Sequence, residues 1–530
     1  MCFAATLPVC TQGGAKEEAL LVDPVPANGA AFGWAVDISG DAAIVGGYLD
    51  DPDGHQNAGA AYIFRRSDAG AWNPEDKLVA TDAMADDNLG TAVAIWGDTA
   101  IVGAFSEEDP GSTITGSCYA FKRNSKGNWG EHAKFVAAGL ADFDGFGWSA
   151  DLWENTAVVG SWYFNINPGR AHVFLRQGDN WIEESELLPI GAVANSGFGM
   201  CVSVSGELAA VGAPGDSTTG FSNEGAVFVF KRVGASWVQQ AKLTPPGSLV
   251  GVAFGRSVAL AGERLIVGAY LDDDAAQDAG SAYVFEFEQE TGSWLEEGKL
   301  LASDAGADDL FGFSVAIQGT HALVGAPGDD QPGGTNAGAA YVFGQCGGLW
   351  SQEDKFMGSA LMAEARFGRS LAYESPLAIV GAPAIVNTGA FALGEGYAFE
   401  LPFLCSSEAV RLGTPPNPMA LLPGQSSGPL LGAAWDPVID HSNFMPGAVL
   451  DFLGITAGPF NLPLISLGTL LCDPTILVSI EFTYPGSSFS IPIPSDCAFV
   501  GASVCTQGAS LDGLGAILLT NAIDLTIGTQ

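Results

Sequence analysis

The chain has 530 residues, which is enough for a large hydrophobic core and for more than one domain. It contains 60 acidic and 20 basic residues, so its formal charge is −40. A field of this sign repels nucleic acid and anionic lipid, which argues against both as partners and leaves cations as favourable ones. No run of 18 apolar residues is present, so we expect no membrane span.

Residues 1–13 carry no repeat and are expected to form a mobile end. This stretch lacks the basic start and the long apolar core of a signal peptide, so no leader is visible in it. The next run, KEEALL at 16–21, is similar to PEDKLV and EEGKLL further along the chain. We therefore expect it to form a strand of the same type.

A repeat starts with a Phe-Gly pair and recurs up to about residue 400. Leu-Gly replaces this pair in the second copy, and its glycine stands at positions 33, 90, 147, 199, 255, 312 and 368, which defines seven repeats. A second glycine, which opens Gly-Ala-Pro or a variant of it, follows 13 residues later in every copy, as Gly325 follows Gly312. A GAAYVF-type run comes next, and in six copies a Trp and a Lys-Leu type pair complete the repeat.

Each repeat contains four apolar runs that alternate at a period of two and are separated by Gly, Asp, Asn and Pro, which predicts four β-strands. Seven such units predict an all-β fold with a seven-bladed β-propeller of four-stranded antiparallel blades over residues 14–401. One blade cannot bury both of its faces without a neighbour on each side. Glycines of the first two strands are expected near the axis, where they let backbones approach.

The sequence Phe311-Gly312, followed by Gly325-Ala326-Pro327 and with six sister copies, resembles the FG-GAP repeat of integrin α-subunit propellers and of many secreted bacterial proteins. The resemblance implies a propeller that is secreted or held at the cell surface. The family often binds calcium in a D-x-D-x-D-G-x-x-D loop between the first two strands. In this chain that turn has only two or three residues, so the family's site is not carried over.

The seventh repeat ends at Phe399 without the Trp and the Lys-Leu type pair. Its outer strand is therefore missing from that part of the chain. We predict that the run at 16–21 supplies this strand and closes the ring without a covalent link.

Loops 2–3 and 4–1 share one face of an up-and-down blade, and here both are acidic. Alternate acids with a third oxygen donor four residues later suit a hard cation, so we predict calcium in two of the 2–3 loops. The predicted ligands are Asp51, Asp53 and Asn57 in the first repeat and Asp272, Asp274 and Asp278 in the fifth. The alternative is that these side chains cap loop amides and stay solvated. The acids of the 4–1 loops are expected to bond backbone amides.

Tryptophans fall into two groups. Six of them recur on the fourth strands and are expected to pack between blades. Five further tryptophans in the propeller region break the repeat pattern and either line a sugar- or peptide-binding surface or pack in the core; they are Trp34, Trp96, Trp148, Trp153 and Trp162.

Residues 402–530 have a different composition, with short apolar runs divided by Pro and Gly, which predicts a small C-terminal β-sandwich-like domain. It resembles C-terminal domains of secreted planctomycete-type proteins. If the protein is exported, Cys405, Cys472, Cys497 and Cys505 could form two disulfides, whereas Cys118 and Cys201 are expected inside strands.

No nucleophile elbow and no zinc-ligand spacing is present, and the five histidines occupy unrelated repeat positions, so no catalytic residue is predicted. We expect an extracellular, non-catalytic binding or adhesion protein that recognises a protein or glycan ligand through the loop face, with calcium as a cofactor. The alternatives are a polysaccharide lyase or hydrolase and a structural component of a surface assembly, because propellers serve in all these roles.

Overall fold

The structure is a computed structural model. It describes residues 15–401 apart from 25–28, 109–113, 136, 163–167, 218–221, 248–250, 332–333, 347–348 and 385–393, together with the strands of the part beyond residue 401. Contacts between Cα atoms divide the chain into one unit of residues 14–401 and a second unit of residues 1–13 and 402–530.

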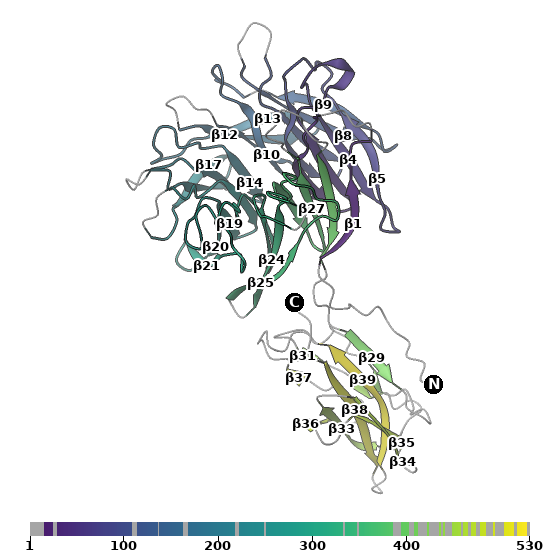
Figure 1. Cartoon of the computed structure of the whole chain (residues 1–530). Helices are drawn as coiled ribbons and strands as arrows, with labels where there is room; N and C mark the ends of the chain where they lie inside the picture. Colours follow the sequence, from purple (N-terminus) through teal and green to yellow (C-terminus); the bar gives the residue numbers. More distant parts are fainter. Residues whose placement is uncertain are drawn as a thin grey trace. The chain divides into compact units, whose positions relative to one another are not determined.

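Residues 14–401 fold as the predicted seven-bladed propeller of four-stranded antiparallel blades (Figure 1). From the innermost strand outward, blade 1 consists of β2 (Phe32–Ser39), β3 (Ala42–Gly47), β4 (Ala60–Arg66) and β5 (Trp72–Leu78). Blade 2 consists of β6 (Leu89–Trp96), β7 (Thr99–Ala104), β8 (Ser117–Arg123) and β9 (Trp129–Phe135). Blade 3 consists of β10 (Phe146–Trp153), β11 (Thr156–Ser161), β12 (Arg170–Gln177) and β13 (Asn180–Leu187).

The next three blades keep the same order. Blade 4 consists of β14 (Cys201–Ser205), β15 (Leu208–Ala213), β16 (Ala226–Val233) and β17 (Ser236–Leu243). Blade 5 consists of β18 (Ser257–Ala261), β19 (Arg264–Ala269), β20 (Ser281–Glu288) and β21 (Ser293–Leu300). Blade 6 consists of β22 (Ser314–Gln318), β23 (His321–Ala326), β24 (Ala339–Cys346) and β25 (Leu349–Phe356).

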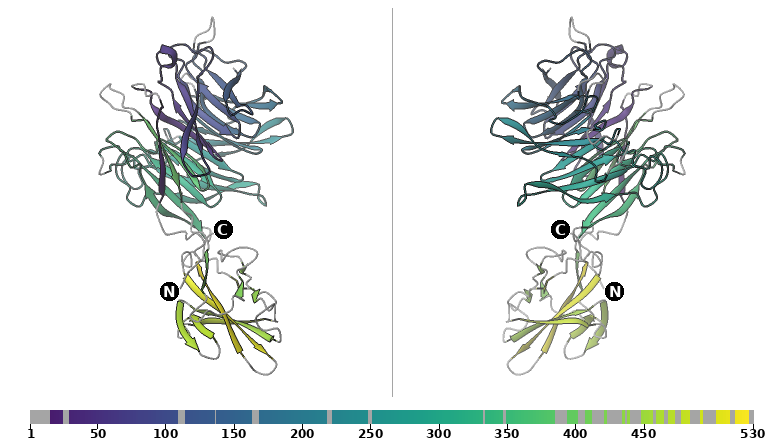
Figure 2. Two further views of the ribbon diagram at one scale, coloured as in Figure 1. Left: turned by 90° about the vertical axis from the view of Figure 1, so that its right-hand side faces the viewer. Right: turned by 90° about the vertical axis from the view of Figure 1, so that its left-hand side faces the viewer.

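Blade 7 takes its strands from both ends of the propeller sequence. It consists of β26 (Ser370–Glu374), β27 (Leu377–Ala382), β28 (Glu395–Glu400) and, as the outer strand, β1 (Lys16–Leu21). Strand β1 pairs antiparallel with β28, from Lys16 opposite Glu400 to Leu21 opposite Gly396. The run KEEALL thus fills the place left by the unfinished seventh repeat, and in Figure 2 the purple strand β1 lies beside the green strands of blade 7.

The repeated glycines stand where the backbones of adjacent blades meet. Gly312 has a φ of +87°, and a Cβ on it would overlap the carbonyl oxygen of Ser281 in the preceding blade. A Cβ on Gly325 would overlap the carbonyl oxygen of Gly368 in the following blade. Glycine alone tolerates both the close approach and the positive φ, which explains why the two markers keep a fixed spacing.

The hydrophobic core lies between blades. One cluster joins Ile44 and Ile63 of blade 1 to Val102 and Tyr119 of blade 2. Another joins Ile379 and Ala398 of blade 7 to Phe32, Val45 and Tyr62 of blade 1. Each blade therefore buries its two faces against two neighbours, and the last blade packs on the first as the others pack on one another.

The fourth strand of every blade contains a β-bulge at the same position. The register between the third and fourth strands shifts by one residue in blades 1 to 6, and the pairing of β28 with β1 shifts at the equivalent point, between Glu17 and Ala19. One residue of the fourth strand is therefore left unpaired in each blade. These bulged residues are Glu18, Glu75, His132, Glu184, Gln240, Glu297 and Glu353.

Beyond residue 401 the structure describes only the strands. A five-stranded antiparallel sheet has the order β29-β39-β38-β33-β36, with β29 (Ser407–Arg411), β33 (Ala448–Thr456), β36 (Leu477–Thr483), β38 (Ser503–Asp512) and β39 (Ile517–Thr526). Three two-stranded pairs add β30 (Leu421–Leu422), β31 (Ala434–Trp435), β32 (Val438–Ile439), β34 (Pro459–Leu464), β35 (Gly468–Cys472) and β37 (Ile491–Pro492). The elements described in this part are all strands, in agreement with the predicted β-domain, while the proposed disulfides involve side chains outside the described residues.

Candidate functional site

The 2–3 loops of five blades begin with a buried carboxylate that a lysine neutralises. In blade 6, Nζ of Lys355 lies 2.7 Å from Asp329 and 2.6 Å from Asp304, and the Tyr341 hydroxyl lies 2.6 Å from Asp329. The lysine belongs to the Lys-Leu type pair of the fourth strand. Equivalent pairs are Lys77 with Asp50, Lys134 with Glu107, Lys242 with Asp216 and Lys299 with Asp272. The loop face is therefore less acidic than the sequence indicates.

Two of the three predicted calcium ligands of blade 5 contact a lysine instead. Nζ of Lys299 lies 2.8 Å from Oδ2 of Asp272 and also forms an ion pair with Asp274. Burial raises the pKa of Asp272, but hydrogen bonds from Lys299 and Ser281 outweigh burial and hold that pKa below its ordinary value. Asp278, the third predicted ligand, uses its backbone amide to donate to Oδ1 of Asp273 at 2.7 Å. Lysine already supplies the positive charge expected from calcium in this loop.

The predicted ligands of blade 1 form no ion pair with a lysine among the described residues. Oδ1 of Asp51 accepts the amide of Asn57 at 2.7 Å, and Nδ2 of Asn57 donates to Asp86 of the 4–1 loop at 2.8 Å. Asp53 is exposed in the short 3₁₀ turn η1 (Pro52–Gly54). In the described part of the chain, no three His, Cys, Asp or Glu side chains are arranged to hold a metal ion. Calcium binding stays a prediction for this loop.

Carboxylates of the 4–1 loops accept hydrogen bonds from backbone amides of the same loop. Oδ2 of Asp87 accepts the amide of Met84 at 2.6 Å, and Asp144 accepts that of Ala141 at 2.7 Å. In blade 6, Oδ2 of Asp309 accepts the amide of Gly306. The expected bonding to backbone amides is confirmed for these three acids, whereas Asp82 and Asp304 of the same loops form ion pairs with Lys134 and Lys355.

In five blades the indole of the fourth-strand tryptophan donates to the bulged residue of the preceding blade. The indole of Trp237 in blade 4 donates to Glu184 of blade 3 at 3.0 Å, and Arg232 forms an ion pair with the same carboxylate. Trp72, Trp129, Trp294 and Trp350 donate in the same way to Glu18, Glu75, Gln240 and Glu297. Trp181 stacks on Phe135 of blade 2. The fourth-strand tryptophans therefore pack between blades, as predicted.

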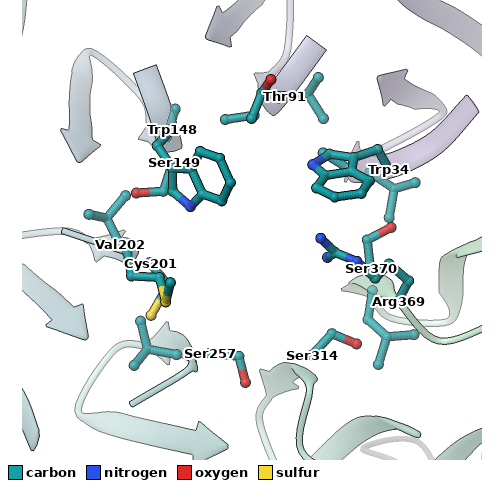
Figure 3. Close-up of a pocket in the computed structure, with 18 of the residues that line it drawn as sticks. Trp34, Thr91, Trp148, Ser149, Cys201, Val202, Ser257, Ser314, Arg369 and Ser370 are labelled. Atoms are coloured by element: carbon teal, nitrogen blue, oxygen red, sulfur yellow. The ribbon is translucent and has the colours of Figure 1, made fainter. Parts of the chain in front are cut away.

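An axial pocket opens among the innermost strands and has a volume of about 200 Å³. Each of the seven blades contributes the three residues that follow its Phe-Gly glycine (Figure 3). The first layer holds five kinds of side chain in the seven blades, namely Trp34, Thr91, Trp148, Met200, Arg256, Phe313 and Arg369. The strands thus place large and charged groups where the chain leaves the 4–1 loops, at the mouth of the pocket on the loop face.

The second layer holds the blades together. Its serines donate to the carbonyl of the Phe-Gly glycine of the following blade, as Ser314 donates to Gly368 at 2.7 Å and Ser370 to Gly33 at 3.0 Å. Sγ of Cys201 replaces a serine and lies 3.2 Å from the oxygen of Gly255. This layer is structural, so the first layer is the part of the pocket that is free to contact a ligand.

Four consecutive first-layer side chains form an arginine–aromatic arc, made of Arg256, Phe313, Arg369 and Trp34. The guanidinium carbons of Arg256 and Arg369 lie 4.2 Å and 4.6 Å from the ring centre of Phe313, and Arg369 also lies 3.9 Å from that of Trp34. Tyr48 packs on Trp34 with ring centres 4.5 Å apart. Arginine stacks on aromatic faces because its charge is spread over a plane.

Both arginines of the arc lack a counter-charge. Neither guanidinium has a hydrogen bond or an ion pair with any residue that the structure describes, although the chain carries 60 acids. Burial lowers the pKa of Arg256, and burial together with the charge of Arg256 lowers the pKa of Arg369 to about 9. The mouth of the pocket is a local cationic site in an acidic protein.

The other propeller tryptophans that break the repeat pattern lie in two places. Trp148 lines the pocket across from the arc, where its ring packs against Phe105 and Trp162 at 4.9 Å each (Figure 3). Trp96 and Trp153 lie at the other ends of β6 and β10 and pack on each other at 4.6 Å. Of these four tryptophans, Trp148 alone lines the pocket.

Two carboxylates follow on the innermost strands, one residue beyond the pocket lining. Oδ2 of Asp37 accepts the amide of Ile95 and Oδ2 of Asp151 that of Val204, both at 2.7 Å. Burial and the charge of Asp151 raise the pKa of Asp37 to about 8. These groups tie adjacent blades together and point to no reaction by themselves.

Comparison with known proteins agrees with this architecture. The family model described as FG-GAP repeat matches six segments, 16–64, 72–121, 129–174, 181–230, 237–285 and 294–343, which cover more than half of the chain. The chain belongs to the FG-GAP repeat family. Each matched segment begins on the fourth strand of one blade and ends on the third strand of the next, so the sequence unit is offset by one strand from the blade.

Other comparisons are less informative. No curated protein matches the sequence. Among solved structures, that of Saccharomyces cerevisiae Sqt1 aligns over 74% of this chain and 100% of its own length, with 11% identity and a TM-score of 0.40, too low to support an argument about function. Within the described residues, no helix has the length and apolar character that crossing a bilayer requires.

Proposed function

We propose that this protein is an extracellular, non-catalytic binding or adhesion protein that recognises a protein or glycan ligand at the loop face of its propeller, with the axial pocket as the point of contact. One observation carries the proposal. The first layer of the pocket changes from blade to blade, whereas the layers that hold the blades together repeat. Side chains that pack the fold have no reason to differ at one position alone, while a ligand that lies across several blades requires different partners from each.

The extracellular location is supported by the resemblance of the repeats to secreted and integrin-type propellers and by the acidic composition. Calcium remains part of the proposal for the loop of blade 1. Detection of the protein outside intact cells, against a cytoplasmic marker, tests the location.

Binding is tested on arrays of glycans and of peptides, with and without calcium. We expect specific signals for the wild-type protein and their loss in Trp148→Ala, which removes a pocket side chain. The matched control is Trp96→Ala, which removes a tryptophan at the far end of its strand. A reducing-sugar release assay on the same glycans tests the rival enzymatic function, and turnover of any bound glycan would overturn the non-catalytic proposal.

A further inference from the structure

We propose that the arginine–aromatic arc selects a ligand that carries one carboxylate next to a ring, a sugar acid such as a terminal uronic acid being the kind that fits it best. This inference rests on the proposed function and names the chemistry that the pocket recognises. The first step is the missing counter-charge. Arg256 and Arg369 approach each other around Phe313 and have no carboxylate partner among the described residues.

Their surroundings make this absence informative. Arginines elsewhere on the propeller meet acids, as Arg66 meets Glu18 and Arg123 meets Glu75. Two like charges beside each other in a partly dry pocket repel, and an anion bound between them relieves that repulsion. A guanidinium presents a planar fork of donors that matches both oxygens of a carboxylate.

The ring is required by the other side chains of the first layer. Trp148 faces the arc across a space of about 200 Å³, which is less than a drug-sized ligand occupies and suits a single six-membered ring. An indole face stacks on the flat C–H surface of a sugar or on another aromatic ring. A carboxylate on the arc and a ring against Trp148 therefore satisfy both sides of the pocket at once.

The charge of the loop face limits the ligand to one anionic group near the pocket. Exposed carboxylates on this face include Asp53, Asp86, Asp142, Asp273 and Asp308. Their field opposes a polyanion, and it opposes a doubly charged phosphate more than a singly charged carboxylate. The site therefore favours an acid group at the end of an otherwise neutral chain.

The proposal is tested by calorimetric titration of the whole protein with D-glucuronate, D-glucose, glucose 6-phosphate, benzoate and polygalacturonate. We expect D-glucuronate to bind at least tenfold more tightly than D-glucose or glucose 6-phosphate, and polygalacturonate to bind more weakly per residue than the monomer. Benzoate distinguishes a sugar acid from an aromatic acid: tighter binding of benzoate than of D-glucuronate would overturn the sugar-acid assignment.

Two substitutions locate the binding. Arg369→Gln and Arg256→Gln should each weaken D-glucuronate at least tenfold, while Arg170→Gln, which removes the same charge from a guanidinium paired with Glu186, should leave it unchanged. Arg369→Lys keeps the charge but not the planar fork of donors, so it should lose an intermediate amount of affinity for D-glucuronate. As a conservative change, it also provides a folded variant for comparison. Melting curves establish that each variant is folded.

The outcomes separate this inference from the proposed function. Affinity for D-glucuronate that is insensitive to both arginines overturns the inference. If a neutral glycan binds as tightly as an acidic one, and Trp148→Ala abolishes this binding, the inference is overturned and the proposed function stands. No binding of any probe at the pocket, together with arrays that are unaffected by Trp148→Ala, overturns both.

Discussion

Oε1 of Glu18 lies 2.6 Å from Nη2 of Arg66, so a carboxylate at the start of the propeller sequence joins blade 7 to blade 1. The same carboxylate accepts the indole of Trp72 at 3.3 Å. Burial opposes the charge of Glu18, but the bonds from Arg66 and Trp72 outweigh burial and lower its pKa. The seam that closes the ring therefore has the chemistry of the seams between covalently continuous blades.

Deleting residues 1–22 should destabilise the propeller strongly, because blade 7 loses its outer strand and leaves the edge of β28 unpaired. The measurement is the free energy of unfolding in urea, together with the sharpness of the transition. Deleting residues 1–13, which keeps β1 whole, is the control. Equal unfolding curves for the two truncations would show that β1 contributes nothing.

Replacing Lys299 with Met should cost roughly 3–5 kcal/mol, since it leaves the buried carboxylate of Asp272 without its cation. Lys126→Met, at an exposed position of blade 2, is the matched control and should change stability by less than about 0.5 kcal/mol. The double variant Lys299→Met with Asp272→Asn should recover part of the loss. Additive losses in this double-mutant cycle would contradict the pairing.

Gly312→Ala should destabilise the protein by roughly 3 kcal/mol or more, because a Cβ there meets the backbone of the preceding blade as well as a positive φ. Gly319→Ala is the comparison, since Gly319 also has a positive φ but has open space around it. That variant should lose only about 1–2 kcal/mol. Similar melting temperatures for the two would refute the close-approach explanation of the repeat glycine.

The pH dependence of stability should carry a signature of Asp37. Its pKa is about 8 in the folded state, raised by burial and by Asp151 from an ordinary value of 3.8. Between these values the folded protein keeps a proton that the unfolded chain has lost, so the contribution of Asp37 falls as pH rises from about 4 to 8. Asp37→Asn should flatten the melting temperature over this range relative to wild type. The exposed variant Asp68→Asn should not.

Calcium should distinguish the two predicted loops. If Asp51 and Asp53 bind the ion, a hundredfold excess over the dissociation constant stabilises the protein by about 2.7 kcal/mol, and replacing both with Asn abolishes that gain. Replacing Asp272 and Asp274 should instead destabilise the protein with or without calcium, because Lys299 loses its partners. A melting temperature that a chelator leaves unchanged at constant ionic strength would end the calcium hypothesis.

The spacing of the glycines predicts the blades because every copy of the repeat needs a glycine at the same two positions, where the backbones of adjacent blades approach each other. The sequence of the acidic loops is misleading because the lysines that neutralise them lie on the fourth strand. Lys299, for example, stands 27 residues after its partner Asp272, so the residues of the loop do not indicate the ion pair. The Lys-Leu type marker contains the signal, because a cation that recurs at a partly buried position of the fourth strand requires a recurring acid.

The pocket is hidden for the opposite reason. Trp34, Arg256 and Phe313 occupy the same place in three repeats, directly after the Phe-Gly glycine, but they share no side-chain type. A repeat motif is defined by the residues that recur, so it does not include such a position. Aligning the repeats on their glycines and asking where they differ would have found the first layer, although not the absence of partners for its arginines, which depends on the folded surroundings.

Strand β1 also has a consequence for synthesis on the ribosome. It emerges before every other strand of the propeller, yet its partner β28 emerges last, with Lys16 opposite Glu400. Six blades can form while β1 waits with unpaired backbone groups, and the outer edge of blade 7 stays open until β1 returns to it. In this interval the β1 strand of one nascent chain can pair with the β28 edge of another. Neighbouring ribosomes on one messenger would therefore favour exchanged dimers, and slow or well-spaced translation would favour the closed monomer.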